Sequence, residues 1–304
     1  MTAAAFIAAD WGNTHARFWL CDGDGQVVDA RSAPGAKETA AAEGGFSAAF
    51  DAATAGWPAA IPAVMCGMVG SNFGWVDAGY RDVPIALTAI AADLFRIDHE
   101  GRLIAIVPGI KGINAFGLPD TVRGEEVQML GAAMLSGRAD ATILCPGTHN
   151  KWARIADGAV AAFHSSVTGE LFALLAEQSI LVAAGAAAVS ADNPGFARGV
   201  ALVHGHGGVG LETLVYAARG FMLTGDLAAG DTASFLSGVI IGCDLRTGLG
   251  AAAGAYDAPI LCVCSEELAE LYAAALAQFG RTSARVAGDD AALAGLTAAY
   301  RALT

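Results

Sequence analysis

Apolar and polar positions follow one another along the chain in blocks that predict an α/β protein. Residues 6–9 are continuously apolar, residues 11–15 contain the Gly and Asn of a turn, and residues 16–20 are again mostly apolar. This pattern predicts a strand, a turn and a second strand, and residues 27–32 fit a third antiparallel strand. A dinucleotide-binding unit would instead follow its first strand with a glycine-rich turn and a helix.

Further along, the chain changes to alternating strands and helices, and residues 141–155 repeat the strand, turn and strand of the N-terminus. We therefore expect two α/β domains of similar plan, residues 1–125 and 126–304, each within the usual domain size. The helical period and the buried apolar runs predict the other elements. Helices are expected over 46–55, 125–135, 169–188, 210–224, 231–248 and 265–280 and at the C-terminus, and strands over 62–70, 103–110 and 259–264.

Composition narrows the function classes. The 304 residues include 17 Lys and Arg against 30 Asp and Glu, a net charge of −13, and they lack the basic face that bulk nucleic-acid binding needs. Only 15% of the residues are charged, so we expect an ordered protein. The mean hydropathy is +0.49, but the apolar stretches are Ala-rich and shorter than the roughly 20 residues of a membrane span. We expect no membrane partner.

The six cysteines show no CxxC spacing, and the N-terminus lacks the basic region of a secretion signal. A chain of this length does not need disulfides to fold, so the cysteines are expected to be reduced thiols. The sequence thus predicts a cytoplasmic protein without a disulfide or a zinc site.

Asp10 stands at the end of the first apolar strand, directly before the turn residues Gly12, Asn13 and Thr14. A carboxylate in this place is suited to hold the water shell of Mg²⁺, while Gly12 allows a phosphate to approach the backbone closely. The alternative is an Asp that opens an Asx-turn in an ordinary hairpin.

Residues 146–151 form a second candidate. Lysine occurs at three positions only, and Lys151 comes just after a turn that contains Gly147 and Thr148. Gly147 and Thr148 offer phosphate donors and Lys151 offers charge, although an ordinary loop with a solvated Lys fits as well. His149 has no other His at metal-binding spacing, so it is expected to be structural or a hydrogen-bond donor.

Glu125 and Glu126 follow Arg123 and Gly124 and open a predicted helix. Acids in a first helical turn are favoured by the helix macrodipole, which explains them without any chemistry. A base that accepts a proton from a sugar hydroxyl also needs such a place, and the sequence leaves open which glutamate that is.

A glycine-rich stretch, residues 66–75, follows the predicted strand 62–70. Its glycines are interleaved with polar and aromatic residues that would suit a wall for a polyol or a hydroxy acid, or simply a packing turn. The members with candidate substrate contacts are Gly70, Ser71, Asn72 and Trp75.

Other motifs exclude several enzyme classes. Residues 204–210 match GxGxxG, but no useful apolar strand precedes them in a βαβ unit, so we discount a dinucleotide site. The chain contains no GxxxxGK[ST], protein-kinase, GxSxG or HExxH motif. P-loop and protein-kinase phosphotransferases and typical serine hydrolases are thereby excluded.

Taken together, these motifs resemble those of the 2-dehydro-3-deoxygalactonokinases, a bacterial family in the actin, sugar kinase and Hsp70 superfamily. The matching stretches run in family order across nearly the whole chain. They are DWGNTHARFWL (10–20), GMVGSNFGW (67–75), VPG (107–109), RGEEVQMLGA (123–132), PGTHNKW (146–152), VTGEL (167–171), FLSGVIIG (235–242) and VAGDDAALAG (286–295).

The resemblance implies a two-domain actin-like (ribonuclease H-like) ATPase fold with a nucleotide cleft between the domains. It implies ATP-dependent phosphorylation of 2-dehydro-3-deoxy-D-galactonate at its C6 hydroxyl, with Mg²⁺, in galactonate breakdown. The turns 10–14 and 146–151 resemble the two phosphate hairpins of the superfamily. Asp10 would then help to hold Mg²⁺, and Thr148 would contact the transferred phosphate.

For the base, the spacing in related sugar kinases favours Glu125, with Glu126 second. The substrate carboxylate would meet Arg17, Arg123 or Lys151, and Ser71 and Asn72 would meet hydroxyls. Ser265 and Gly288 are the expected contacts to the nucleoside. The chain departs from the family at Cys66, where Ala is common and a packing change is expected, and at 263–265, where Val-Cys-Ser stands in place of Ala-Gly-Thr.

Two other functions remain open at this point. Kinship in fold does not fix the substrate, so the chain is alternatively a kinase of another 2-oxo-3-deoxy acid or of a sugar. The departure at Cys264 also fits a sensor that binds a sugar acid or a nucleotide without turnover. The sequence leaves the oligomeric state open, a homodimer included.

Overall fold

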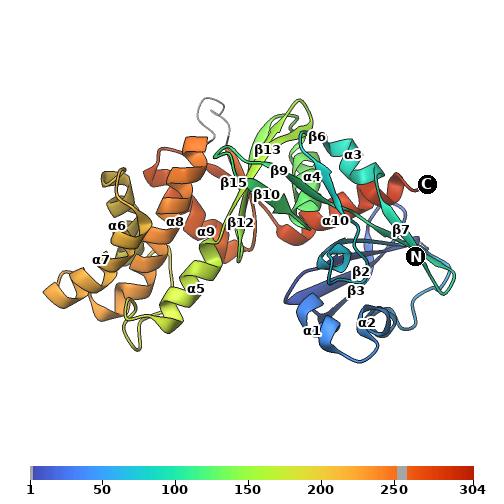
Figure 1. The fold of residues 1–304 in the computed structure, drawn as a ribbon, viewed down its shortest axis with the longest axis horizontal. Coiled ribbons are helices and arrows are strands. Elements are labelled where there is room, and N and C mark those ends of the chain that lie inside the picture. Colours follow the sequence, from blue (N-terminus) through green and yellow to red (C-terminus); the bar gives the residue numbers. More distant parts are fainter. Residues whose placement is uncertain (1–2, 252–258) are drawn as a thin grey trace. The chain divides into compact units, whose positions relative to one another are not determined.

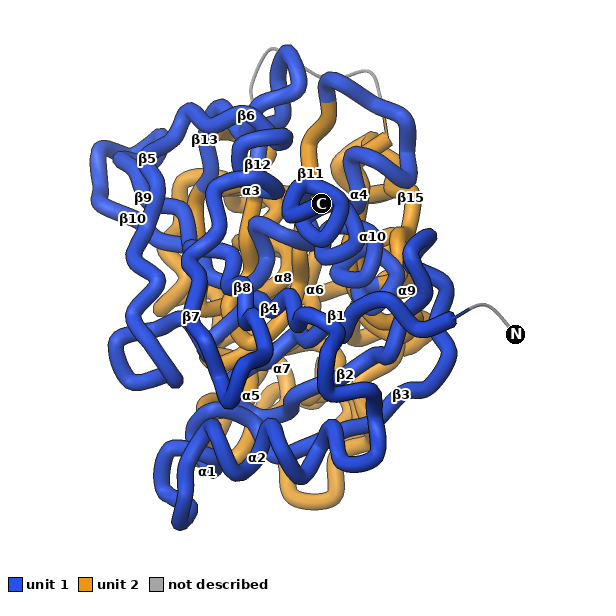
Figure 2. Tube along the Cα trace, turned by 90° about the vertical axis from the view of Figure 1, so that its right-hand side faces the viewer, with its two compact units in different colours: residues 1–140, 153–163, 288–304 blue, residues 141–152, 164–287 orange. Residues whose placement is uncertain are grey.

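The computed structural model describes residues 3–251 and 259–304 (Figure 1). The chain forms two compact units, which Figure 2 shows in two colours. Unit 1 contains residues 1–140, 153–163 and 288–304, and unit 2 contains residues 141–152 and 164–287. Residues 126–140 and the C-terminal helix thus pack with the N-terminal part of the chain, whereas the sequence had suggested one boundary after residue 125.

Unit 1 contains most of the N-terminal half of the chain and the last helix. Its strands are β1 (Phe6–Trp11), β2 (His15–Cys21), β3 (Val27–Pro34), β4 (Ala63–Gly67), β5 (Tyr80–Asp82), β6 (Ile85–Ala86), β7 (Phe95–His99), β8 (Arg102–Ile106), β9 (Gly109–Ile113) and β10 (Pro119–Val122). Its helices are α1 (Ala36–Ala41), α2 (Gly45–Ala53), η1 (Met68–Gly70), α3 (Leu87–Ala92), α4 (Glu125–Ser136) and α10 (Gly288–Arg301).

Unit 2 is mainly helical. Its strands are β11 (Ala141–Cys145), β14 (Ile260–Val263) and β15 (Ser283–Val286), and the strands β12 (Asn150–Ala156) and β13 (Ala159–Ser166) cross the division between the units. Its helices are α5 (Thr168–Gln178), α6 (Pro194–Gly205), α7 (Leu211–Thr224), η2 (Ala229–Asp231), α8 (Thr232–Ala251) and α9 (Glu266–Gln278).

The two larger sheets repeat one strand order. The first runs β3-β2-β1-β4-β8, with β7 at its edge, and the second runs β13-β12-β11-β14-β15, with β6 at its edge. Without the edge strands, both orders are third, second, first, fourth and fifth. This shared order confirms the repeat expected from the sequence.

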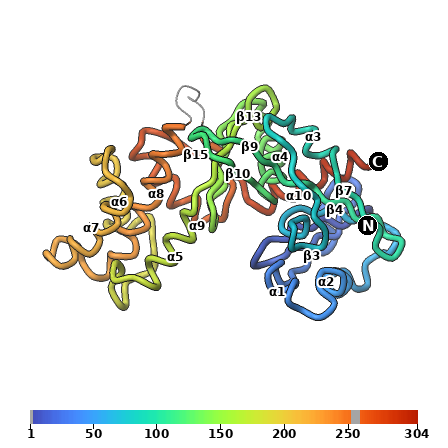
Figure 3. The backbone as a smooth tube through the Cα atoms, viewed as in Figure 1, coloured from blue at the N-terminus to red at the C-terminus, as the bar shows by residue number. Residues whose placement is uncertain are grey.

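Unit 1 buries the central strands of its main sheet on both faces. All six residues of β1 are buried, as a continuously apolar run predicts for a central strand. On one face, Trp11 packs against Phe18 and Phe46, with ring centroids 5.1 and 5.2 Å apart. On the other face, Phe6 stacks on Tyr300 of α10, and Figure 3 shows α10 beside α4 and β4.

Helix α8 forms the centre of unit 2. Every residue from Thr232 to Leu245 is buried, which is typical of a helix that packs on all sides. Figure 1 shows α6 and α7 beside it. Gly199 of α6 and Gly238 of α8 permit this close crossing, because a Cβ on Gly238 would lie 2.2 Å from the carbonyl oxygen of Phe196.

Most of the predicted elements are present, and the differences have local causes. The helix expected over 169–188 ends at Gln178. Helix α6 was not expected, since Gly195 and Gly199 lower helix propensity. It begins at an Asn193 cap that accepts the N–H of Gly195 at 2.8 Å, and packing on α8 stabilises it. The three-stranded sheet β10-β9-β5 was also missed.

Among the described helices, none combines the length and the hydropathy of a membrane span.

The close α6–α8 crossing predicts opposite effects for two Gly→Ala variants in helices of unit 2. Gly238→Ala should destabilise the protein by about 1–3 kcal/mol, because the added methyl group overlaps the α6 backbone. Gly220→Ala has open space and should be neutral or stabilise by up to about 1 kcal/mol. Urea unfolding followed by circular dichroism measures both values, and equal shifts for the two variants would contradict the packing described.

Candidate active site

The end of β1 places Asp10 in a buried polar cluster of unit 1. Arg17 lies opposite Asp10 on β2, and Cys66 lies beside it on β4. Arg17 Nη2 donates to Asp10 Oδ2 at 2.8 Å, and Cys66 Sγ donates to Asp10 Oδ1 at 3.8 Å. Arg17 also pairs with Asp289 in the first turn of α10. Both strand neighbours of Asp10 therefore bind its carboxyl group.

Burial determines the acidity of this cluster. Asp10 is 7% exposed, and burial raises the pKa of its carboxyl group, while the charge and hydrogen bond of Arg17 act against the rise. Burial, and next the charge of Asp10, raises the pKa of the Cys66 thiol well above its usual range. Cys66 thus stays a protonated hydrogen-bond donor and contributes more than the packing change expected from the sequence.

The turn after β1, residues 12–14, is exposed at Asn13 and Thr14. The carbonyl oxygens of Gly12, Asn13 and Thr14 accept hydrogen bonds from the N–H groups of residues 35–37 at the start of α1. None of these bonds uses an N–H group of the turn itself, and Asn13 and Thr14 are exposed. The turn is therefore fixed through its carbonyl side, as a phosphate-binding turn requires.

Two glycines bring the start of α4 to the end of β4. Gly67 and Gly124 have φ of 91° and 107°, and a Cβ on Gly124 would lie 3.3 Å from the Cα of Gly67. Glu126 is fully buried there and its Oε2 accepts the N–H of Gly124 at 2.6 Å, while Oε1 has no hydrogen-bond partner among the described residues. Burial raises the pKa of Glu126 well above its usual range, which favours its protonated form. Glu125, the residue before it, is half-buried.

Arg123 is held just before this helix. Its guanidinium lies 4.2 Å from the ring centroid of Tyr80, and its Nη2 donates to the carbonyl oxygen of Gly79 at 3.0 Å. Its Nε and Nη1 are buried and have no partner among the residues that the structure describes. A Cβ on Gly70 would lie 3.1 Å from Nη1, which explains a glycine at that position. Arg123 is thus a fixed cation with unused donors.

The other candidates of the stretch 66–75 differ in their surroundings. The Ser71 hydroxyl donates to the carbonyl oxygen of Met68 at 2.8 Å and closes the turn, whereas Asn72 is exposed. The Trp75 ring packs against Phe50 and His99, with centroids 5.6 and 5.0 Å apart. The structure thus gives Ser71 and Trp75 roles inside the fold of unit 1.

In unit 2, the turn between β11 and β12 carries Gly147, Thr148 and His149, all exposed. The carbonyl oxygen of Thr148 accepts the N–H of Glu170 in the first turn of α5, and the His149 Nε2 lies 2.6 Å from the Glu170 carboxylate. The N–H of Gly147 donates to Asn150 Oδ1 at 3.0 Å, so it is used within the protein. Thr148 therefore has the exposed hydroxyl of this turn.

A buried network holds that turn in place. Asp244 of α8 is 7% exposed and accepts hydrogen bonds from Asn150 Nδ2 at 2.8 Å and from Trp152 Nε1 at 3.2 Å. Ser166 donates to its other oxygen, and Asn150 also donates to the hydroxyl of Tyr272. Asp244 holds the side-chain amide of Asn150 in one orientation. It thereby also positions the Oδ1 atom of that amide, which accepts the N–H of Gly147.

The remaining candidates lie apart from this network. Lys151 is only 6% exposed, and no carboxylate of the described residues lies within ion-pair distance of it. Ser265 caps α9 by accepting the N–H of Leu268 at 3.5 Å. Gly288 belongs to unit 1, where it opens α10 directly before Asp289.

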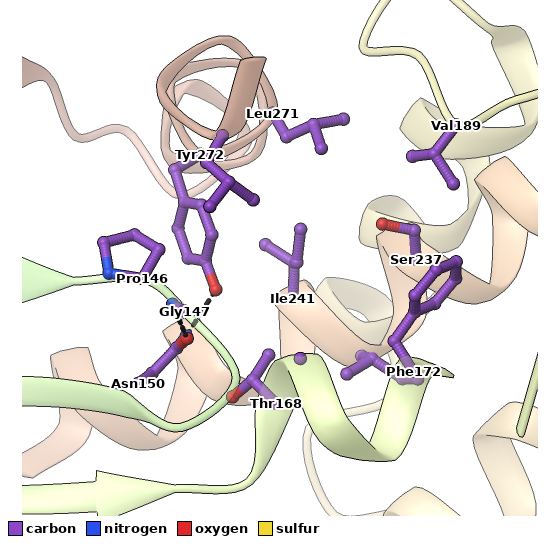
Figure 4. A pocket seen from close by; sticks show the side chains of 13 residues that line it. Pro146, Gly147, Asn150, Thr168, Phe172, Val189, Ser237, Ile241, Leu271 and Tyr272 are labelled. Atoms are coloured by element: carbon purple, nitrogen blue, oxygen red, sulfur yellow. Dashed lines mark hydrogen bonds between the residues drawn. The ribbon is translucent and has the colours of Figure 1, made fainter. Parts of the chain in front are cut away.

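A cavity of about 140 Å³ opens beside the turn 146–149 in unit 2 (Figure 4). Its lining is mostly apolar and comes from the turn, α5, α8, α9 and Val189. The lining residues are Pro146, Gly147, Asn150, Thr168, Gly169, Phe172, Val189, Ser237, Ile240, Ile241, Leu268, Leu271 and Tyr272. An apolar cavity of about this volume accepts a flat ring of the size of benzene, so the cavity is suited to part of an aromatic base.

No group of three or more His, Cys, Asp or Glu side chains among the described residues is placed to hold a metal ion. A single carboxylate such as Asp10 is compatible with Mg²⁺, because each of its oxygens has a second lone pair and Mg²⁺ keeps several waters and phosphate oxygens as ligands.

Sequence reasoning missed three residues of these sites. Asp244 is the single acid of α8 and follows twelve uncharged residues of that helix, which was a usable signal. Tyr272 gave no signal, because it lies in an ordinary helical pattern, and Ser237 lies within the family-like stretch FLSGVIIG (235–242), in which nothing distinguished the serine as a site residue.

The family assignment comes from comparison with known proteins. The sequence model of the family described as 2-keto-3-deoxy-galactonokinase matches residues 10–299. The chain belongs to this family. A Rhizobium meliloti protein assigned as a 2-dehydro-3-deoxygalactonokinase is 38% identical over 99% of this chain and 98% of its own length. The Escherichia coli 2-dehydro-3-deoxygalactonokinase is 32% identical over 96% of each chain.

Solved structures agree with the 2-keto-3-deoxy-galactonokinase assignment. A crystal structure from Sinorhizobium meliloti, described as a 2-dehydro-3-deoxygalactonokinase, is 36% identical to this chain. Its TM-score is 0.91 over 98% of this chain and 99% of that one. Component A of (R)-2-hydroxyglutaryl-CoA dehydratase from Acidaminococcus fermentans is 10% identical, with a TM-score of 0.52 over 99% and 100% of the chains. Together with the repeated strand order, this likeness confirms the predicted actin-like fold.

The buried Glu126 predicts a pH-dependent effect of Glu126→Gln. At pH values between the ordinary pKa of a glutamate and the raised pKa of Glu126, this residue is ionised in the unfolded chain but protonated in the folded protein. The free energy of unfolding therefore falls as the pH rises through this range. Glutamine does not ionise, so Glu126→Gln removes this pH-dependent destabilisation. Compared with the wild type, the variant should have a higher free energy of unfolding at pH 8 and a similar one at pH 4.

Urea unfolding at the two pH values measures this difference. The exposed Glu177→Gln variant serves as the control, since it should shift neither value. An equal effect of Glu126→Gln at both pH values would show that Glu126 is not protonated in the fold.

Proposed function

We propose that this protein is an ATP-dependent kinase that phosphorylates 2-dehydro-3-deoxygalactonate on its C6 hydroxyl group. The observation that carries the proposal is the repeat of the strand order, because it puts the turns 12–14 and 147–149 at equivalent ends of their first strands. The names of the two curated relatives support the substrate.

In this proposal, unit 2 binds the nucleotide. The base enters the cavity beside Tyr272 and Phe172, and the phosphates extend towards the turn 147–149. The Thr148 hydroxyl then donates to a phosphate oxygen. Lys151, a largely buried cation without a carboxylate partner among the described residues, adds positive charge.

Unit 1 supplies the groups for the transfer. The N–H groups of the turn 12–14 face phosphate oxygens, and Asp10 holds Mg²⁺ through water. Bound Mg²⁺ neutralises phosphate charge and orients the phosphoryl group. Arg17 keeps the Asp10 carboxylate in place, since it binds Asp10 and Asp289 at the same time.

Glu125 is the proposed base. It stands at the start of α4, half-buried, and accepts the proton of the C6 hydroxyl as that oxygen attacks the phosphorus. Glu126 is unsuited to this role because it is fully buried, and burial raises the pKa of its carboxyl group and disfavours the charged form that a base needs. Its hydrogen bond to Gly124 instead fixes the start of the helix.

Arg123 is the proposed partner of the substrate carboxylate. Of the three cations suggested by the sequence, Arg17 is already paired with two carboxylates and Lys151 lies beside the phosphate turn. Arg123 has donors without partners among the described residues, and buried donors are costly until an acceptor satisfies them.

The central test incubates the protein with ATP, Mg²⁺ and 2-dehydro-3-deoxygalactonate. ADP formation is expected, with phosphorus coupling to C6 in the NMR spectrum of the product. Glu125→Gln should lower kcat by about 10²–10⁴-fold, whereas its neighbour Glu126→Gln should retain most turnover. Nucleotide binding without ADP from a panel of 2-oxo-3-deoxy acids and sugars would instead identify a sensor, and faster turnover of another acid would correct the substrate.

Arg123→Met tests the recognition of the carboxylate. It keeps an unbranched apolar side chain and removes the charged guanidinium, so the KM for the sugar acid should rise by about 10–100-fold, as for loss of a charged hydrogen bond. The KM for ATP should not change. Arg81→Met is the matched control, because Arg81 forms only an exposed ion pair with Asp93 in the same unit. An unchanged KM for the sugar acid would assign the carboxylate to another residue.

A further inference from the structure

The cavity of unit 2 contains a polar group that the fold leaves unused. Ser237 of α8 lines this cavity and is 5% exposed. No hydrogen bond joins its hydroxyl to another residue in the described part of the chain. Figure 4 shows that hydroxyl directed into the cavity, between Phe172 and Ile241.

Other hydroxyl groups of the same helix behave differently. Thr232 donates to the carbonyl oxygen of Ala229 at 2.8 Å and accepts the N–H of Ala183 at 3.0 Å. Ser234 accepts the N–H of Ser190 at 3.3 Å. A helical serine commonly bonds the carbonyl group four residues earlier, and Ser237 makes no such bond. The Ser237 hydroxyl group therefore faces the cavity with its donor and acceptor both unused, and a ligand in the cavity can bind them.

The position of Ser237 in the cavity indicates which part of a bound nucleotide would contact its hydroxyl group. In Figure 4, Ser237 lies across the cavity from Pro146 and Gly147, which belong to the turn assigned to phosphate. A purine bound with its sugar and phosphates towards that turn presents its 6-substituent on the far side. This substituent is an amino group, a donor, in adenine and a carbonyl oxygen, an acceptor, in guanine.

The side chains that line the cavity determine how strongly the site discriminates between adenine and guanine. A serine hydroxyl both donates and accepts, so it satisfies either substituent. The 13 lining residues include no carboxylate that would select the N–H groups of guanine. The remaining walls near Ser237, such as Phe172, Val189 and Ile240, are apolar and hold any flat ring by stacking and burial.

We propose that Ser237 reads the 6-substituent of the purine base, and that its hydroxyl group makes the protein use ATP and GTP with comparable efficiency. This inference rests on the proposed function, because it takes the cavity of unit 2 as the base site. It makes Ser237 a base-binding residue that accepts either purine nucleotide, with no role in the transfer itself.

The test compares four nucleotides on the wild-type protein, Ser237→Ala and Ser234→Ala. Calorimetric titration with ADP, GDP and purine riboside diphosphate, which lacks the 6-substituent, measures Kd independently of turnover. Ser237→Ala should raise the Kd of ADP and GDP by about 3–10-fold, the loss of one hydrogen bond, and leave that of purine riboside diphosphate unchanged. Ser234→Ala should change none of the three. UDP, whose base has one ring, should bind more weakly than ADP to all three proteins.

Turnover supplies the second measurement. The kcat/KM values for ATP and GTP should agree within about ten-fold, a difference of the size of one hydrogen bond, and kcat at saturating ATP should be unchanged by Ser237→Ala. A preference of more than 100-fold for one purine, or equal Kd values for wild type and Ser237→Ala, would overturn the inference. If nucleotides bind as expected but no acid is phosphorylated, the proposed function fails while the role of Ser237 stands.

Discussion

Burial of the first strand of each main sheet on both of its faces is the constraint on which the candidate site depends. Every residue of β1 and of β11 is buried. A charge in the middle of such a strand would lose its hydration without compensation. Charged groups are therefore confined to the strand ends: Asp10 lies at the end of β1, and the turn 146–149 follows β11. Open α/β sheets in general bind ligands at the carboxyl ends of their strands for this reason.

The two turns are stabilised in different ways. The turn 12–14 is fixed by its own carbonyl groups, which bind the start of α1 nearby in the chain. The turn of unit 2 depends on Asp244, which lies 94 residues after Asn150. A carboxylate surrounded by three donors in a low-dielectric interior holds them firmly. The geometry of one strand-to-strand turn is thus determined by a helix formed much later in the sequence.

The fold could be predicted from the sequence wherever the signal was local. The apolar runs of β1 and β11, each followed by a turn with Gly and Thr, predicted the repeat of strand, turn and strand. Helix α6 could not be predicted in this way. Gly199 lowers the local helix propensity, and its benefit, the close packing of α6 on α8, involves residues far away in the sequence. The same is true of β5, β9 and β10, whose pairing joins segments that are short and half-exposed.

The candidate site was predictable to a similar extent. Asp10 and Glu126 follow recognisable patterns, but the effect of burial on their acidity depends on neighbours from other strands and helices. Cys66 illustrates this limit, since only the register of β1 with β4 shows that its thiol donates to Asp10. Ser237 became distinct only when the bonds of the other hydroxyl groups in α8 were known.

All six cysteines of the chain are buried, including Cys66 beside Asp10 in unit 1 and Cys145 at the end of β11 in unit 2. Water-soluble maleimides react with exposed thiolates, so the folded protein should leave such reagents unreacted. A cysteine introduced at an exposed turn position such as Asn72 would then carry a fluorescent label alone, without prior removal of native thiols. The fold therefore offers a ready background for following ligand binding by site-specific fluorescence.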